Sequence, residues 1–487
     1  MTIDYHAILP VLILSGTIVI VLVTDLFLSP RHKSASMWVA LVGVLATLVA
    51  VLSLIGKGDR TTFGGSYQVD AFTIVFQTFF ISAAAVVLLI SYRYFREGGF
   101  YQGEYYFLLL TSFLGCLLMP ASRDLLMLFL ALELVSAPGF LMAAFRKSDV
   151  KGNEGGLKFF LIGVLSTAVM LYGMSLIYGL TGHLQLAAVS TGLQQLSGAK
   201  ETLANAAILF VVVGFAFKVS AVPFQFWAPD TYEGSPVPVA AFLGVASSAA
   251  GFAGLLQLMF VAFVHEYTFW VPLFVALSLV TMTLGNLVAL QQRQVVRLLA
   301  YSGIAQTGYI LLPFALVSAD PSVNRSAFQA AVTYILIYGI MNLGAFGVTT
   351  AISGRHPSLR IEDFAGLART APLLATAMTV FMVSLAGVPP TGGFWAKLLI
   401  FQAGIQRGGV GVLLAVAMVI NSVISVGYYF LIPRAMIFED AEDQTPFRSP
   451  ILVTAVVAVA MTALLVIFVV PNTIYRLGEV TSLGFGG

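Results

Sequence analysis

Four ionisable side chains stand inside stretches that are otherwise apolar enough to lie in lipid: Glu133, Lys158, Lys218 and Lys397. Carboxyl and amino groups bind and release protons, and charged groups at membrane depth usually mark an ion or proton path. We therefore predict a proton relay in which Glu133 pairs with Lys218 or Lys158. The alternative is a set of static ion pairs that only joins helices, although the stretch around Lys397 contains no acidic residue.

Prolines accompany these charges. Pro223 lies five residues after Lys218 in VVVGFAFKVSAVPFQFWAPD (211–230), and Pro138 lies five residues after the glutamate. Proline lacks an N–H and crowds the carbonyl four residues back, so the helix should break and leave the Val219 carbonyl free. A free carbonyl at membrane depth needs protein or water. A cation beside such a carbonyl predicts a hydrated ion path. The alternatives are that the lysine reaches the membrane surface, or that the kink only serves packing.

A second broken helix is predicted at Pro389 and Pro390 in GVPPTGGFWAK (387–397), with two separate short spans as the alternative. Ala-Val-Pro followed by Phe-Trp in 221–227 resembles Gly-Val-Pro followed by Phe-Trp in 387–395. The two copies lie five predicted spans apart. An odd offset turns the second copy upside down in the membrane, as in transporters built from inverted repeats.

The elements that position these groups are membrane helices. The chain of 487 residues is 59% apolar and 9% charged, whereas a soluble protein needs more polar surface. We predict an all-α polytopic membrane protein with about 14 transmembrane helices. Their approximate ranges are 8–28, 37–55, 69–92, 105–121, 124–145, 157–180, 203–228, 237–258, 267–289, 295–317, 326–353, 371–408, 411–437 and 449–471.

Charge distribution predicts the orientation. With the N-terminus outside, 14 basic residues, including Arg31 and Arg448, fall on the inner side and 7 on the outer side. Basic loops favour the cytoplasmic side, so both termini are expected on the outer face. The acidic run from Glu439 to Asp443, which includes Asp440 and Glu442, should then be a solvated inner loop. The net charge of +2 gives no reason to expect a nucleic-acid partner.

A path between the charges needs polar side chains and water, although each such side chain is equally explained by a hydrogen bond between helices. The candidates are Ser247, Ser248, Asn286, Tyr301, Ser302, Gln306, Thr307, Tyr309, Tyr334 and Asn342. All five histidines fall in loops or at span ends, and Cys116 is the only cysteine, so no disulfide, iron–sulfur or cysteine-based zinc site is expected. We expect Gly152, Gly155 and Gly156 to form a flexible loop.

Five stretches (132–140, 156–182, 217–243, 297–309 and 387–401) resemble the antiporter-like membrane subunits of respiratory complex I, above all the subunit-N branch of bacterial proton-translocating NADH–quinone oxidoreductases. The resemblance implies two inverted five-helix repeats with broken seventh and twelfth helices. It divides the chain into 1–104 (helices one to three), 105–258 (first repeat), 259–437 (second repeat) and 438–487 (acidic loop and helix fourteen).

The same resemblance implies that redox energy released in other subunits drives proton translocation here. No redox chemistry and no cofactor are then expected in this chain, and NADH, flavin, iron–sulfur clusters and quinone belong to partner subunits. Partners would be neighbouring antiporter-like and small hydrophobic subunits in a bacterial cytoplasmic membrane. Two alternatives stay open: a subunit of a multi-subunit cation/proton antiporter, and a structural spacer that does not pump.

Residue by residue, Glu133 looks like the family's helix-five glutamate and Lys218 like its helix-seven lysine. Lys158 is similar to the helix-six lysine, and Lys397 to the helix-twelve lysine where protons exchange with the outer side.

Three positions depart from the family pattern. Ser248 stands where a helix-eight lysine is common, and Gln225 and Gln306 stand where histidines are common. Serine and glutamine order water but do not hold a proton near neutral pH. Transfer between Lys218 and Lys397 would then depend on water.

Overall fold

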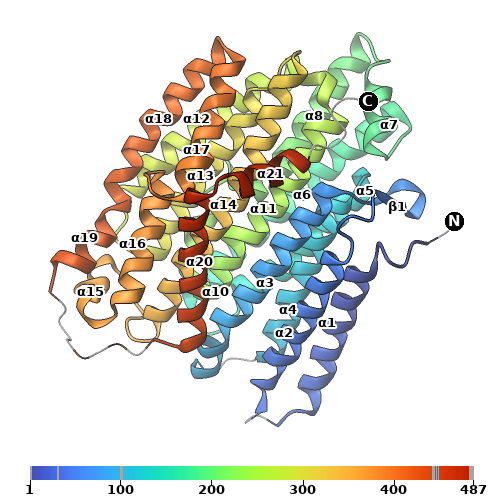
Figure 1. The fold of residues 1–487 in the computed structure, drawn as a ribbon. Coiled ribbons are helices and arrows are strands. Elements are labelled where there is room, and N and C mark those ends of the chain that lie inside the picture. Colours follow the sequence, from blue (N-terminus) through green and yellow to red (C-terminus); the bar gives the residue numbers. More distant parts are fainter. Residues whose placement is uncertain are drawn as a thin grey trace.

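The computed structural model describes residues 3–29, 32–98, 102–440, 445, 447 and 449–481, and nearly all of this part is helical (Figure 1). Arg31, Glu442, Asp443 and Arg448, which entered the predicted loop charges, lie outside the described residues. Thirteen helical runs of the described residues are long and apolar enough to cross a membrane. The predicted all-α polytopic fold is confirmed.

The first half of the chain carries the helices α1 (Leu9–Phe27), α2 (Ala35–Leu52), α3 (Ala71–Glu97), α4 (Gln102–Leu118), α5 (Leu125–Ala143), α6 (Val150–Thr181), α7 (Leu186–Leu193), α8 (Ala199–Lys218), α9 (Trp227–Gly234), α10 (Val237–Phe242) and α11 (Ser248–Gln257). The second half carries α12 (Tyr267–Ala289), α13 (Val295–Ala315), α14 (Pro321–Ser353), α15 (Leu367–Thr370), α16 (Pro372–Ala386), α17 (Gly392–Arg407), α18 (Val410–Tyr429), α19 (Leu431–Phe438), α20 (Ile451–Val469) and α21 (Asn472–Val480).

One of the two interrupted helices accounts for the difference between thirteen spans and the predicted fourteen. The predicted span 371–408 is divided into α16 and α17, each shorter than a full crossing. The predicted span 203–228 is α8, and the short helix α9 follows its break. By contrast, the helix break predicted at Pro138 is absent, and α5 continues past this residue to Ala143. Packed neighbours allow a membrane helix to tolerate one lost hydrogen bond at a proline.

Aspartates fix where several helices begin. The side chains of Asp70, Asp124 and Asp320 each accept a hydrogen bond from a backbone N–H in the first turn of α3, α5 and α14. Such caps satisfy amide groups that have no partner within the helix. The loops that carry these aspartates therefore set the ends of the apolar segments.

The centre of the bundle is the run Val237–Ala262, where π-helical segments at Leu243–Ser247 and Leu258–Ala262 flank α11. Every residue in its most apolar stretch of 18 residues is buried, whereas 28% of the residues are buried in the corresponding stretch of α1 and 22% in that of α20. Figure 1 shows α11 and α14 running through the middle, with α1 and α2 at one edge and α18 at the other. The proposed boundary between repeats, after residue 258, falls inside this central run and stays a prediction.

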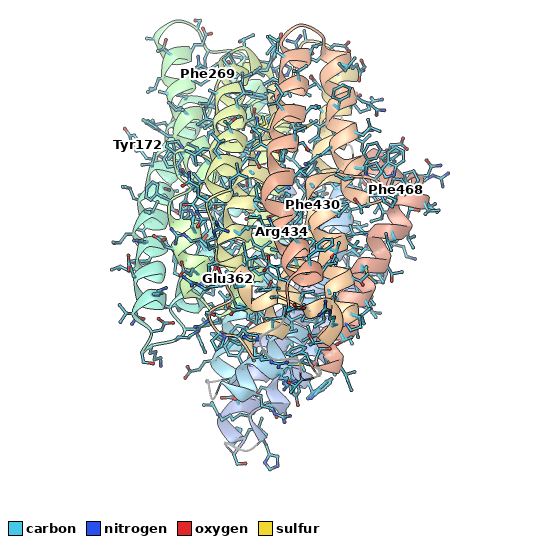
Figure 2. The ribbon with its side chains drawn as sticks, turned by 90° about the vertical axis from the view of Figure 1, so that its left-hand side faces the viewer. Tyr172, Phe269, Glu362, Phe430, Arg434 and Phe468 are labelled. Carbon is cyan, nitrogen blue, oxygen red and sulfur yellow. The ribbon has the colours of Figure 1, made fainter. Side chains whose placement is uncertain are left out.

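The periphery carries apolar and aromatic side chains that face outward, as lipid contact requires. In Figure 2, Tyr172 and Phe269 lie along one edge of the bundle and Phe468 along the other, while Phe430 and Arg434 follow each other from α18 into α19. One element was not predicted. A short antiparallel hairpin pairs β1 (Arg60–Thr62) with β2 (Tyr67–Val69) between α2 and α3.

Candidate functional site

The first broken helix places Lys218 at the last position of α8, where its side chain is only 2% exposed. Its Nζ donates to Ser136 Oγ on α5 at 2.8 Å. The chain leaves the helix at Val219, and the carbonyl of that residue accepts a hydrogen bond from Thr307 Oγ1 at 2.6 Å. The carbonyl released near Pro223 is therefore held by a side chain of α13, which belongs to the second half of the molecule.

Glu133 lies one helical turn before Ser136 on α5, so both face the same side of that helix. One of its carboxylate oxygens, Oε1, is buried and has no hydrogen-bond partner among the described residues. Lys218 is within electrostatic reach of this carboxylate, but its amine is bonded to Ser136 and no ion pair joins the two in the described part of the chain. The predicted direct pairing of Glu133 with Lys218 is therefore absent among the described residues, where the Lys218 amine bonds Ser136 and the Ser136 hydroxyl donates to the Leu132 carbonyl at 2.7 Å.

Lys158 does not pair with Glu133 either. Its Nζ lies 2.7 Å from Glu154 and 2.6 Å from Asp230. Its side chain is 40% exposed, unlike those of the other two intramembrane lysines. Lys158 thus lies at a polar edge of the bundle, where it has two carboxylate partners.

These contacts continue into a chain of ion pairs. Asp230 on α9 uses its second oxygen to bind Arg297 of α13 at 2.7 Å. The same guanidinium lies 3.0 Å from Glu233, which in turn lies 2.9 Å from Lys151 of α6. The sequence interpretation did not single out Asp230 or Glu233. Their spacing could have indicated a shared role, because carboxylates three residues apart lie on one face of the short helix that follows the break.

The second broken helix is built differently. Helix α16 ends at Ala386, and Gly387 continues with φ of 83°. Lys397 is 7% exposed, and its Nζ donates to the Ala386 carbonyl at 2.8 Å and to Ser422 Oγ at 2.7 Å. The amine also stands 4.8 Å from the centre of the Tyr309 ring, a cation–π contact. The end of the broken helix itself thus supplies an acceptor to the lysine.

The side chain of Lys397 also lines a cavity of about 390 Å³ between α17 and α18. Apart from Lys397 and Ser422, the side chains around it are apolar. The cavity is partly open, and α18 forms one of its walls through Met418, Val419, Val423 and Val426. The second lysine therefore lies close to the periphery.

A buried polar cluster surrounds Gln306 on α13. Its Nε2 donates to the Tyr429 hydroxyl at 2.9 Å and to the Leu385 carbonyl at 3.1 Å. The Tyr334 hydroxyl donates to its Oε1 at 2.5 Å, and Ser302 shares a hydrogen bond of 2.6 Å with Tyr429. The cluster therefore connects α13, α14 and α18 to the end of α16, one residue before the carbonyl that holds Lys397.

Tyr309 belongs to a second cluster beside the first. Its hydroxyl accepts from Asn286 Nδ2 at 2.9 Å, and the Tyr428 hydroxyl donates to Asn286 Oδ1 at 2.9 Å. Asn421 on α18 accepts from the same amide at 3.2 Å. Of the polar candidates predicted for this region, Asn286, Ser302, Gln306, Tyr309 and Tyr334 all enter these two clusters.

The remaining candidates are distributed around the central helix. Ser247 is buried, and Ser248 Oγ donates to the Leu243 carbonyl at 3.0 Å. Close by, the Tyr338 hydroxyl donates to the carbonyl of Gly244 at 3.1 Å, and it accepts from Asn342 Nδ2 at 2.9 Å. Tyr301 is half-buried and its ring lies 6.0 Å from the guanidinium of Arg297, at the edge with the ion pairs.

The described residues contain no group of three or more His, Cys, Asp or Glu side chains placed to hold a metal ion. The glycines expected to form a loop are instead inside α6, where Gly152 and Gly155 lie against the backbone of α9. A Cβ at Gly155 would stand 2.7 Å from the Asp230 carbonyl oxygen. These glycines permit a close helix contact, which apolar spacing alone did not reveal.

Comparison with known proteins agrees with this architecture. The profile of the family described as "NADH:quinone oxidoreductase/Mrp antiporter, TM" matches residues 122–425. Subunit N 2 of the NADH-quinone oxidoreductase of Streptomyces griseus subsp. griseus is 39% identical, over 99% of this chain and 94% of that protein. Subunit N of Trichlorobacter lovleyi is 38% identical, over 94% and 92%.

Solved structures give the same result. A chain of respiratory complex I from Thermus thermophilus is 32% identical, covers 98% of this chain and 100% of its own, and superposes with a TM-score of 0.80. A chain of the Mrp complex from Dietzia sp. reaches a TM-score of 0.84 at 19% identity, which shows the shared fold alone. The resemblance predicted from five stretches of sequence is confirmed, and the chain belongs to the NADH:quinone oxidoreductase/Mrp antiporter transmembrane family.

Proposed function

We propose that this chain translocates protons as a membrane subunit of a complex I-type NADH:quinone oxidoreductase. One observation carries the proposal. Lys218 and Lys397 are both buried beside a broken helix, and the hydrogen-bond partners of their amines are neutral oxygens. A permanent ammonium ion without a paired carboxylate is costly at membrane depth. An amine that gains and loses a proton in turn avoids part of that cost.

Glu133 is the proposed partner of Lys218. Its buried Oε1 has no hydrogen-bond partner among the described residues, so it is available to accept a proton or a water molecule. Ser136 lies on the same face of α5 and already bonds the Lys218 amine. The Ser136 hydroxyl donates to the Leu132 carbonyl at 2.7 Å, so a water molecule at Glu133 Oε1 is the proposed link between the carboxylate and the Lys218 amine.

Between Lys218 and Lys397 the proposed path combines hydroxyls and water. The hydroxyls of Tyr334, Tyr429 and Ser302 can each donate one hydrogen bond while accepting another. The amide of Gln306 orders its neighbours but does not pass a proton on. Water must therefore bridge at Gln306, and a second water is proposed beside the central helix, where Asn342 Oδ1 has no partner among the described residues.

Lys397 is the proposed exchange point with the outer side. The polar groups of the adjoining cavity of about 390 Å³ are Lys397 and Ser422, so water that reaches the lysine would bind at these two side chains. The lysine amine lies at its wall. Lys158, in contrast, has two carboxylate partners and is partly exposed, so we assign it to the polar edge of the path rather than to its interior.

The remaining features of the proposal follow from the family. The electron-transfer chemistry, with NADH, flavin, iron–sulfur clusters and quinone, belongs to partner subunits. Neighbouring antiporter-like and small hydrophobic subunits flank this one in a bacterial cytoplasmic membrane, with both termini on the outer face. Residues 105–258 and 259–437 form the two inverted repeats. Relatives named subunit N, at 38–39% identity over most of their length, support the oxidoreductase in preference to an antiporter.

The test compares proton transfer with electron transfer in membrane vesicles that contain the assembled complex. Lys218→Met and Lys397→Met should each lower the number of protons translocated per electron, because methionine keeps the length of the side chain and removes the amine. Lys57→Met, at an exposed loop position, is the matched control and should leave the ratio unchanged.

Two outcomes contradict the proposal. A full ratio in both buried-lysine variants would favour a structural spacer. Sodium-dependent proton exchange that persists without NADH and quinone would favour an antiporter.

A further inference from the structure

The ion pairs beside the first broken helix form one connected chain of three cations and three anions. Helix α6 contributes three of these side chains, α9 contributes two and α13 contributes one. The order of contacts is Glu154, Lys158, Asp230, Arg297, Glu233 and Lys151, and we call this set the ion-pair chain. Its charges cancel, so losing any inner member leaves partners uncompensated, which is costly away from bulk water.

Asp230 is the central member. One carboxylate oxygen binds Lys158 on α6 and the other binds Arg297 on α13. It is 28% exposed, while Glu154 at the end of the chain is 60% exposed. An exposed single pair contributes little to stability, but a partly buried carboxylate that bonds two helices at once fixes its own helix between them.

Helix α9 is held closely against α6 by more than charge. Thr231 Oγ1 donates to the Gly155 carbonyl at 2.9 Å, and the missing side chain at Gly155 lets the two backbones approach. Phe159, next to Lys158 in α6, stacks on Trp227 with ring centres 4.1 Å apart and planes within 12°. Trp227 and Asp230 are three residues apart, so both contacts lie on one face of α9.

Trp227 connects this arrangement to the buried lysine. Its indole Nε1 donates to the carbonyl of Phe217 at 3.3 Å, and Phe217 immediately precedes Lys218. The backbone that carries Lys218 is therefore attached to α9, and α9 is attached through Asp230 to α6 and α13. The first broken helix has a continuous set of contacts from partly exposed charges to its buried amine.

We infer that Asp230 is a positioning residue for Lys218 and acts through Trp227. Its two ion pairs fix α9, α9 fixes the indole, and the indole fixes the backbone from which Lys218 reaches Ser136. Asp230 touches no group of the proposed relay directly. The inference rests on the proposed function, because positioning matters only where Lys218 transfers protons.

The test is a double-mutant cycle on the assembled complex in vesicles, with protons translocated per electron as the readout. Asp230→Asn keeps the size of the side chain and removes its charge. A misplacement of about 1 Å can slow a reacting group by about 100-fold, so we expect this variant to slow proton transfer through the subunit by at least about tenfold. Electron transfer would then proceed with fewer protons translocated, and the ratio would fall. In a Lys218→Met background the same substitution should have no further effect, because residues that act through one another are not additive.

Trp227→Phe is a second route to the same result. It keeps an aromatic ring against Phe159 and removes only the N–H that bonds the Phe217 carbonyl, so it should lower the ratio in the same direction even if Asp230→Asn prevents assembly. Asp440→Asn is the matched control. It also removes an aspartate–arginine pair, with Arg369, but one whose side chains are 75% and 68% exposed.

The outcomes separate the two proposals. An unchanged ratio in Lys218→Met sinks the proposed function and this inference with it. Two outcomes would contradict the positioning role alone, provided that Lys218→Met lowers the ratio. In the first, Asp230→Asn and Trp227→Phe leave the ratio unchanged. In the second, Asp230→Asn has the same effect in the wild-type and Lys218→Met backgrounds. A loss in Asp440→Asn as large as that in Asp230→Asn would also overturn it, since any surface charge would then suffice.

Discussion

The two broken helices each present one buried lysine, but their surroundings differ in three ways. The Lys218 amine bonds one side chain, Ser136 of another helix, whereas the Lys397 amine bonds both Ser422 and the carbonyl of Ala386 at the end of its own broken helix. The carbonyl released at the first break, that of Val219, is taken by Thr307 from the second half of the molecule. The first break also has the ion-pair chain beside it, while the second has a cavity.

The difference indicates a division of tasks. Lys218, whose amine bonds one side chain on α5 and is buried, suits the proposed transfer within the subunit. A lysine beside a cavity of about 390 Å³ near the periphery suits exchange with the outside. The shared sequence pattern of valine, proline, phenylalanine and tryptophan sets where each helix breaks. The contacts made by other helices then decide what each break does.

Gly387→Ala should produce the largest change. The residue has φ of 83°, and an added Cβ would lie 2.5 Å from Lys397 Cδ. Left-handed backbone costs alanine about 1–2 kcal/mol, and overpacking adds about 1–3 kcal/mol. We expect a clear drop in the thermal midpoint of the purified complex and a lower proton-to-electron ratio, because the lysine must move.

Gly182→Ala is the matched control for that substitution. Gly182 is also a left-handed residue at a helix end, with φ of 72°, but nothing lies within 4 Å of an added Cβ. It should show only the backbone cost of about 1–2 kcal/mol and no loss of proton transfer. Equal effects of the two variants on proton transfer would show that Gly387 matters for its backbone and not for Lys397.

Thr307→Val tests the link between the two halves at the first break. Valine keeps the shape and removes the hydroxyl that bonds the Val219 carbonyl, and a buried carbonyl left without a partner costs about 1–3 kcal/mol. Thr349→Val on α14 is the control, because among the described residues that buried hydroxyl bonds only the Ala345 carbonyl of its own helix. If Thr307→Val lowers the thermal midpoint no more than the control does, then another group, or water, bonds the Val219 carbonyl in the variant.

Much of this arrangement could be predicted from the sequence. Apolar length gave the spans, prolines gave the two breaks, and lysines within apolar stretches gave the two buried amines. These signals are local, since each depends on residues within one or two helical turns. The free Val219 carbonyl was predicted for the same reason, although Thr307 as its partner was not.

Apart from the break expected at Pro138, the errors concern contacts between distant segments. The sequence predicts pairs among Glu133, Lys158 and Lys218 because these are charges inside apolar stretches. Lys158 instead bonds Asp230, which lies in a polar stretch and carries no signal of its own in the sequence. Gly155, which we expect from the sequence in a flexible loop, lies inside α6, because its packing against α9 outweighs the low helix propensity of glycine. Partner choice depends on which helices meet, and spacing along the chain does not contain that information.

A pair of serine substitutions gives the smallest and finest test of the comparison. Ser136→Ala removes the hydroxyl that bonds the Lys218 amine, while Ser422→Ala leaves Lys397 bonded to the Ala386 carbonyl. A hydrogen bond to a charged group contributes about 1.5–3 kcal/mol and one to a neutral group about 1 kcal/mol, so both effects should be modest. We expect Ser136→Ala to slow proton transfer more than Ser422→Ala in vesicles. A larger effect of Ser422→Ala would place the more demanding transfer step at the periphery and reverse the assignment of tasks to the two breaks.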